Sequence, residues 1–295
     1  MPHALFRLQL GDGSFRLARG DAAQGPGDLL PAGVTLDGLL AVDGPGLEDA
    51  LGASSGGTVP GEARVVAPVE SQEVWAAGVT YLRSMEARAE ESADATPYDL
   101  VYTAERPELF FKSAGWRVRG PGDDVAVRAD SSWNTPEPEL AVVLDAAMSI
   151  MGYTIGNDVS SRTIEGENPL YLPQAKVYDG SCALGPCIVP ANEAEPPFAI
   201  SLEVARGNDH AYRGSTSTEL MKRTFEELAS YLGRALSFPA GAVLLTGTAL
   251  VPDAPFTLEH GDVVRIGIDG LGLLENAVTT VGAGHSASSA RTAPA

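Results

Sequence analysis

The chain has 295 residues, 44% of them hydrophobic and 20% charged, which is the composition of an ordinary globular protein with a large core. Its formal net charge of −19, together with the absence of a basic run in the sequence, argues against a nucleic-acid-binding protein. An anionic substrate would need a metal ion or a local basic pocket to offset this negative field.

The N-terminal sequence lacks the continuous apolar core of a signal peptide, and no stretch of the sequence is long enough to span a membrane. We therefore expect a cytoplasmic protein without a membrane or nucleic-acid partner. Cys182 and Cys187 are the only cysteines, and their spacing fits neither a zinc ligand pair nor a disulfide framework. Both thiols are expected to be reduced and partly buried.

Residues 1–68 are rich in Gly, Pro, Asp and Ala, and they are predicted to form a small N-terminal domain that supports the chemistry without performing it. Strands are expected at 4–9 and 14–18, where alternating residues flank a Gly-Asp-Gly turn typical of a hairpin. One short helix is predicted over 47–51. Pro68 closes this segment.

Residues 69–282 are predicted to form the catalytic domain, because many short strands with few helices indicate a β-rich α+β fold. A charged helix over 82–91 is either a solvated surface helix or a lid over a site. A longer amphipathic helix is expected over 218–236, capped by Thr218. The small and polar tail 283–295 is predicted to be disordered. Strands are expected at 74–79, at 106–112, in two segments between 139 and 155, and at 187–189, 199–205, 243–246, 263–268 and 273–281.

Glu137 and Glu139 open the apolar run 141–144. Residues two apart in a strand point to the same face, so these carboxylates converge where little else is polar. Such a pair is either solvated at the strand start or held together by a cation, for which a hard divalent ion is the simplest choice. Asp158 ends the hairpin partner of this strand and is the expected third ligand, although alone it could cap a turn.

The four histidines are scattered along the sequence, which disfavours a zinc site. Lys176 lies between apolar neighbours, so it either extends to solvent or meets the carboxylates, where a dry pocket could tune it for proton transfer. The small hydroxyls of the segment 246–248, Thr248 among them, could bind a substrate carboxylate or cap a turn.

Five separated motifs, covering roughly residues 70–282, resemble the fumarylacetoacetate hydrolase superfamily. The resemblance implies a rolled-sheet β-rich domain with a divalent metal held by Glu137, Glu139 and Asp158. Mg²⁺ is the expected ion, with Mn²⁺ or Ca²⁺ as alternatives. The motifs are Glu137-Pro-Glu139-Leu-Ala-Val-Val, Gly152-Tyr-Thr-Ile-Gly-Asn-Asp158-Val-Ser-Ser-Arg162, Lys176-Val-Tyr-Asp179 with Leu184-Gly-Pro186, Thr246-Gly-Thr248 and Gly261-Asp262-Val263.

One motif departs from the family. Hydrolases of the family usually have Gly-x-Asn-Tyr-x-x-His after the first catalytic-domain strand, and this histidine serves in water activation. Here the stretch 78–84 ends in Ser84. Serine without a base is a poor substitute in proton transfer, and the departure therefore argues against hydrolysis of a C–C bond.

Three further stretches are similar to the 2-keto-3-deoxy-D-arabinonate dehydratases, which remove water from a 2-keto-3-deoxy sugar acid and yield 2,5-dioxopentanoate. These stretches are Arg106-Pro-Glu108-Leu-Phe-Phe-Lys112, Trp133-Asn-Thr-Pro-Glu137-Pro-Glu139 and Glu167-Asn-Pro-Leu-Tyr171-Leu-Pro-Gln-Ala-Lys176. The resemblance implies a small anionic 2-keto acid substrate and suggests a homodimer or larger homo-oligomer.

In such a reaction Mg²⁺, bound by the carboxylate and keto oxygens of the substrate, stabilises an enolate when a C3 proton leaves. Lys176 and Glu108 are the candidates for the base near C3 and the acid near the C4 hydroxyl, in either order. The residues expected to bind the substrate are Tyr81, Arg83, Lys112 and Thr248.

Two other functions stay open at this stage. One is a hydrolase of the family, or a decarboxylase of a 2-oxo diacid, in which Glu86 or Arg88 replaces the missing histidine. The other is a catalytically idle binding or assembly protein. The carboxylate cluster argues against the idle protein, because a cluster without its cation would only destabilise the fold.

Overall fold

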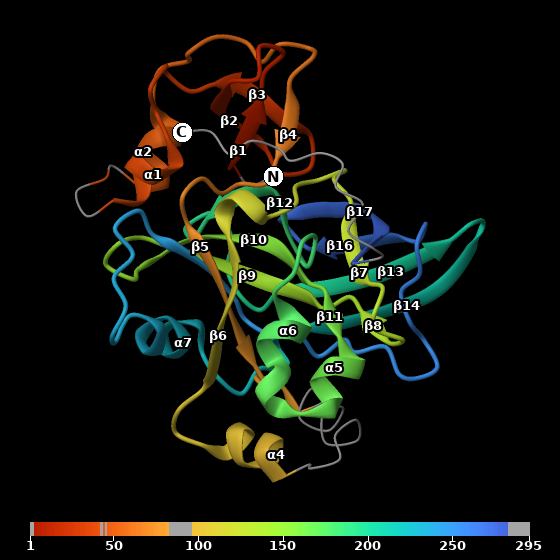
Figure 1. The fold of residues 1–295 in the computed structure, drawn as a ribbon. Coiled ribbons are helices and arrows are strands. Elements are labelled where there is room, and N and C mark those ends of the chain that lie inside the picture. Colours follow the sequence, from red (N-terminus) through yellow and green to blue (C-terminus); the bar gives the residue numbers. More distant parts are fainter. Residues whose placement is uncertain (1–2, 42–43, 45, 83–95, 283–295) are drawn as a thin grey trace.

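The computed structural model describes residues 3–41, 44, 46–82 and 96–282. Within this part of the chain, most strands belong to a ten-stranded sheet and a five-stranded sheet (Figure 1). The large sheet runs in the order β3-β2-β1-β12-β10-β9-β15-β5-β6, and β4 also pairs with β1. Its strands are β1 (His3–Gln9), β2 (Phe15–Asp21), β3 (Gly25–Leu29), β4 (Arg64–Val66), β5 (Glu73–Gly78), β6 (Glu108–Ala114), β9 (Pro138–Leu144), β10 (Ile150–Asp158), β12 (Cys182–Pro190) and β15 (Ala242–Leu245).

The smaller sheet has the order β14-β13-β16-β17-β7, and a two-stranded sheet pairs β11 with β8. Their strands are β7 (Val125–Arg128), β8 (Asn134–Thr135), β11 (Ser160–Ser161), β13 (Ala199–Arg206), β14 (Asp209–Ser217), β16 (Val263–Ile268) and β17 (Gly272–Val281). The described helices are α1 (Leu36–Leu40), α2 (Gly46–Gly52), α4 (Thr96–Thr103), α5 (Arg162–Glu167), α6 (Leu172–Lys176) and α7 (Phe225–Leu232), with 3₁₀ turns at Gly115–Arg117, Pro169–Tyr171 and Thr218–Leu220. The β-rich α+β fold expected from the sequence is confirmed.

Strand β9 lies inside the large sheet between β10 and β15, and all seven of its residues are buried. Leu140, Val142 and Leu144 belong to one hydrophobic cluster, whereas Ala141 and Val143 belong to another. The alternation shows that both faces of the strand are covered, which is why its sequence is a continuous apolar run. A polar side chain at this strand therefore enters a buried environment.

The predicted N-terminal hairpin and the short helix near residue 47 are confirmed as β1–β2 and α2, while α1 was not predicted. The strands of residues 1–68, red to orange in Figure 1, extend the large sheet through β1 and β12, where Leu5 pairs with Ile188. The boundary of a separate N-terminal domain at residue 68 stays a prediction.

The predicted strands of the later chain are present, although the prediction missed the short strands β7, β8 and β11 and the longer strand β14. Strand β14 pairs only with β13 at the edge of the smaller sheet, and its residues are exposed or half-buried. An edge strand of this kind carries no alternation of apolar residues that the sequence could show. The charged segment 82–91, apart from Leu82, and the tail 283–295 lie outside the described residues.

The helix predicted over 218–236 is confirmed only for Phe225–Leu232, and its predicted start at Thr218 is wrong. A 3₁₀ turn occupies Thr218–Leu220, and the α-helix begins only at Phe225. Thr224 caps this helix by accepting a hydrogen bond from the N–H of Glu227 at 3.1 Å. Thr218 instead accepts a bond from the N–H of Phe198 at 2.8 Å, so its hydroxyl joins two segments of the fold.

Cys182 and Cys187 are free and buried, so the prediction of reduced thiols agrees with the structure, which buries them more completely than expected. Burial raises the pKa of both thiols to about 12. No helix in the described part of the chain combines the length and the apolar character needed to cross a membrane.

Candidate metal centre

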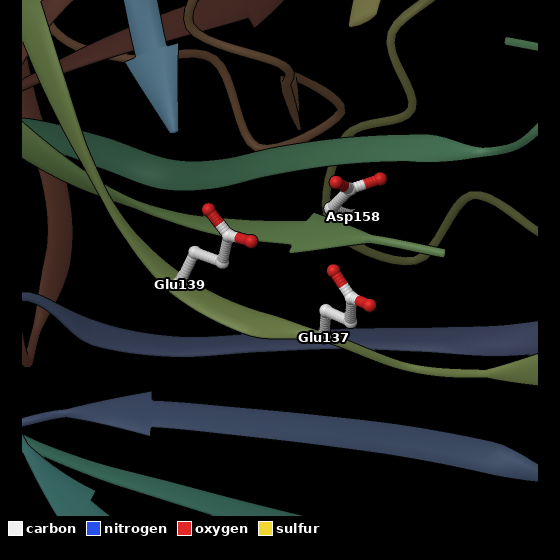
Figure 2. Close-up of side chains that lie close together, drawn as sticks. All are labelled: Glu137, Glu139 and Asp158. Carbon is white, nitrogen blue, oxygen red and sulfur yellow. The ribbon is translucent and has the colours of Figure 1, made fainter. Parts of the chain in front are cut away.

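Glu137, Glu139 and Asp158 lie together where β9 begins and β10 ends (Figure 2). The register of these antiparallel strands places Glu139 opposite Gly156, and the backbone N–H of Asp158 donates to the carbonyl of Glu137 at 3.0 Å. One oxygen of each carboxylate lies within 4.8 Å of the others, and all three residues are buried. The structure thus brings together the three carboxylates that the sequence predicted.

Lys176 lies within this cluster and is completely buried. Its Nζ donates to Glu137 Oε2 at 2.7 Å, to Asp158 Oδ2 at 3.0 Å and to the hydroxyl of Ser160 at 2.6 Å. Of the two alternatives for Lys176, extension to solvent is wrong, and the contact with the carboxylates is confirmed. An ammonium with three acceptors is firmly held in place.

Arg162 is a second cation of the cluster and was given no role in the sequence analysis. Its Nη2 lies 2.8 Å from Glu137 Oε1, its Nη1 lies 3.2 Å from Glu165 Oε2, and its Nε donates to the hydroxyl of Thr135 at 3.2 Å. Both Arg162 and Glu165 are buried. The one feature of the sequence that could have indicated a role for Arg162 is its position as a charged residue directly after the buried stretch that contains Asp158.

Lys112 is the third cation, and it approaches Asp158 from the protein interior. Its Nζ forms an ion pair with Asp158 Oδ1 and donates to the carbonyls of Val159, at 3.2 Å, and Lys176. The residue is fully buried and does not line the cavity described below. From the sequence we predicted that Lys112 contacts the substrate. In the structure, the charged partner of Lys112 is Asp158.

Glu139 has a different environment from the other two carboxylates. Its Oε2 accepts a hydrogen bond from the N–H of Gly247 at 2.6 Å, and among the described residues it takes part in no salt bridge. Burial, and then the charges of Asp158 and Glu137, raise the pKa of Glu139 well above its usual value, against the opposing effects of Lys176 and Gly247. The cations of the protein thus compensate Glu137 and Asp158 but leave Glu139 without a partner of opposite charge in the described structure.

A cavity that opens to solvent adjoins the three carboxylates, and about 270 Å³ of space there, open solvent included, is free of protein atoms. Glu137, Glu139, Asp158, Arg162 and Lys176 form its polar wall, and its remaining lining is Ala77, Gly78, Val79, Phe110, Gly247, Thr248 and Val251. Three carboxylates that converge beside such a cavity form an all-oxygen donor set, which suits a hard divalent cation and leaves coordination positions for water or substrate. The residues present therefore fit a Mg²⁺ ion.

The Glu108 carboxylate lies directly beside residue 78, which lines the cavity, because residue 78 is glycine. The two residues are paired in neighbouring strands, and Glu108 Oε2 lies only 1.9 Å from where a Cβ atom of residue 78 would stand. Any larger residue at 78 would displace this carboxylate. Gly78 itself lines the cavity, whereas Glu108 is not among the lining residues, so the small size of Gly78 lets the Glu108 carboxylate lie next to the lining.

Three residues predicted to bind substrate differ in their placement. Thr248 lines the cavity, and its hydroxyl accepts a hydrogen bond from the N–H of Leu250 at 3.0 Å, so it caps a turn there. Tyr81 is buried and does not line the cavity; burial, and then the charge of Glu139, raise the pKa of its phenol. Arg83, like the predicted lid and Ser84, lies outside the described residues.

Comparison with known proteins identifies the family of this chain. The family model described as fumarylacetoacetate (FAA) hydrolase C-terminal matches residues 73–279, and the chain belongs to this family. A Haloferax volcanii protein named "probable 2-keto-3-deoxyxylonate dehydratase" is 53% identical over 216 residues, which cover 72% of this chain and 74% of that protein. The 2-dehydro-3-deoxy-D-arabinonate dehydratase of Saccharolobus solfataricus is 45% identical over 217 residues, covering 72% and 73%.

A solved structure of 2-keto-3-deoxy-D-arabinonate dehydratase, complexed with magnesium and 2,5-dioxopentanoate, superposes with a TM-score of 0.79 at 35% identity. The superposition covers 94% of this chain and 98% of that chain. The similarity therefore includes the N-terminal strands as well as the residues that match the family model.

The role of Lys112 can be tested by substitution with Met, which keeps the length of the side chain and removes its charge. We expect Lys112→Met to lower the free energy of unfolding by about 3–5 kcal/mol, because one partner of a buried ion pair is lost. Lys222→Met is the control: the Lys222 side chain lies at the surface, and its loss should change the stability by less than about 0.5 kcal/mol. Equal stabilities of the two variants in urea titrations would contradict a structural role of Lys112.

Proposed function

We propose that this protein is a Mg²⁺-dependent dehydratase that converts a 2-keto-3-deoxy sugar acid, such as 2-keto-3-deoxy-D-arabinonate, to 2,5-dioxopentanoate. The observation that carries the proposal is the placement of three carboxylates and Lys176 in the lining of a single cavity, with Glu108 beside the lining residue Gly78. The names of the similar proteins support the class of substrate and the loss of water.

Glu137, Glu139 and Asp158 would hold the Mg²⁺ ion, and Mn²⁺ or Ca²⁺ could take its place. When bound, the ion would supply a Lewis acid for the keto and carboxylate oxygens of the substrate. Lys112 and Lys176 fix the two oxygens of Asp158, and Arg162 and Lys176 fix those of Glu137. Held in this way, the carboxylates need little reorganisation when a ligand enters.

We assign the two proton transfers to Lys176 and Glu108. Lys176 is held as a proton donor by its three acceptors, and we propose it as the acid that protonates the departing C4 hydroxyl. Glu108 is then the base that takes a proton from C3. The proton and the hydroxyl leave as water, and proton shifts from C5 and its hydroxyl to C3 and C4 produce the aldehyde at C5.

The rest of the cavity suits a small anionic 2-keto acid. Arg162 and Lys176 balance two of the three carboxylate charges in its wall, so a bound divalent ion would make the wall attractive to an anion despite the net charge of −19. Val79, Phe110 and Val251 give the rest of the lining an apolar character, which limits the access of water to the reacting carbons. We propose that the hydroxyl of Thr248 contacts the substrate from its turn in this lining.

Several expectations from the sequence stay predictions. These are the homodimer or larger oligomer, the cytoplasmic location and the contacts of Tyr81, Arg83 and Lys112 with substrate. The relatives named above support a metabolic enzyme with a small-molecule substrate, and they do not bear on these points.

The proposed reaction is tested directly by incubating the purified protein with Mg²⁺ and 2-keto-3-deoxy-D-arabinonate. We expect 2,5-dioxopentanoate as the product in NMR spectra, complete loss of turnover with EDTA, and recovery on addition of Mg²⁺. Glu139→Gln should abolish the metal-dependent turnover, because the amide replaces a charged ligand oxygen by a weaker one. Cleavage of an acylpyruvate without any dehydration of the sugar acid would instead support a hydrolase.

The role of Glu108 is tested through its own carboxylate and through Gly78. We expect Glu108→Gln to lower kcat by about 10²-fold or more, because it removes one proton-transfer group, and to leave Mg²⁺ affinity unchanged. Gly78→Ala should have a similar effect on kcat, since the new Cβ would displace the Glu108 carboxylate. Gly52→Ala is the control, because a Cβ there meets nothing within 4 Å. A Glu108→Gln enzyme with wild-type kcat would remove Glu108 from the mechanism.

A further inference from the structure

The turn that follows β5 is tied to the segment that follows β15 by a buried side chain. Thr80 has no exposed surface, and its hydroxyl donates to the backbone carbonyl of Thr246 at 2.7 Å. The carbonyl of Thr80 in turn accepts a hydrogen bond from the N–H of Lys222 at 2.9 Å. Thr80 is therefore fixed through both its side chain and its backbone.

The sheet topology places this contact directly beside the metal centre. Strand β15 lies between β5 and β9, with Leu245 paired to Ala76 on one side and to Ala141 on the other. Two residues beyond Leu245, the N–H of Gly247 points at Glu139 Oε2, at 2.6 Å. Residues 246–247 thus contact Thr80 on one side and Glu139 on the other.

Gly247 fits this position only as glycine. Its φ of +92° lies in the left-handed region, and a Cβ atom would stand 2.0 Å from the hydroxyl oxygen of Thr80. The Thr80 hydroxyl therefore packs against Gly247 while it binds the preceding carbonyl. These two contacts restrict the peptide plane whose N–H meets Glu139.

Val79, directly before Thr80, adopts a φ of +54°, which a β-branched residue rarely does. It is buried and lines the cavity. Such strained residues persist only where the surrounding structure holds them. The bond from Thr80 to Thr246 is one contact that holds this turn against the strain.

We infer that Thr80 is a positioning residue for the metal centre, which acts through Thr246 and Gly247 to fix the orientation of Glu139. Glu139 depends on this support more than Glu137 or Asp158 does, because each of those carboxylates is held by two cations. The inference rests on the metal role that the proposed function gives to Glu139, and not on the identity of the substrate.

The test is isothermal titration of the metal-free protein with MgCl₂, with no substrate present. Thr80→Val keeps the shape of the side chain and removes the hydroxyl, and we expect it to weaken Mg²⁺ binding about tenfold, as loss of an outer-shell contact does. Thr80→Ser keeps the hydroxyl and should restore binding close to the wild-type value. Thr218→Val is the matched control, because Thr218 makes a comparable buried hydrogen bond away from the cavity.

Thermal unfolding of the same three variants separates positioning from general stability. We expect Thr80→Val and Thr218→Val to lose stability to a similar degree, while only Thr80→Val loses Mg²⁺ affinity. Wild-type Mg²⁺ affinity in Thr80→Val would overturn the inference and leave the proposed function intact. A wild-type protein that binds no Mg²⁺ would overturn the metal centre itself, and the inference with it.

Discussion

The structure depends on a buried network of charges in which Lys112, Lys176 and Arg162 hold Asp158 and Glu137. Each of these residues is almost without solvent contact. A buried charge that loses its partner costs several kcal/mol, so each member of the network constrains the others. The members come from β6, β10, α5, α6 and the residue just before β9, and the network therefore ties distant parts of the chain to one point.

We expected a metal to be needed for charge compensation, but the protein supplies three cations of its own. Of the three carboxylates, only Glu139 lacks such a partner among the described residues. A bound ion would therefore change the electrostatic environment of Glu139 more than that of Glu137 or Asp158.

The large sheet positions the remaining chemistry by its register. Glu139, Gly247, Gly78 and Glu108 follow one another across neighbouring segments of the sheet, from β9 past the end of β15 to β5 and β6. The two glycines in this row have different tasks. Gly78 leaves the space that the Glu108 carboxylate occupies, and Gly247 turns its N–H toward Glu139. Of the two carboxylates with separate proposed roles, Glu139 thereby lines the cavity and Glu108 lies beside the lining residue Gly78.

The sequence was sufficient to predict the parts of this site that depend on local periodicity. The spacing of Glu137 and Glu139 in an apolar strand predicted their convergence, and the following hairpin strand predicted the approach of Asp158. The partners of Lys112 and Arg162 could not be predicted, because a charged residue in a sequence carries no sign of which distant residue it meets. The helix predicted over 218–236 was too long for a different reason: Met221 packs against the same hydrophobic cluster as Phe225, Leu228 and Leu232, so the apolar period extends beyond the helix that forms at Phe225–Leu232. Nothing in the sequence indicated a role for Thr80 either, because the residue whose carbonyl it binds, Thr246, lies 166 residues away along the chain.

The central claim is that Glu137, Glu139 and Asp158 bind one divalent ion beside the cavity. The most direct measurement is a crystal structure of the protein soaked in Mn²⁺, whose anomalous scattering locates the ion without ambiguity. The account predicts a single strong anomalous peak within coordination distance of an oxygen from each of the three carboxylates, with Lys176 next to the ion. A peak elsewhere, or a metal-soaked crystal in which the three carboxylates coordinate no ion, would contradict it.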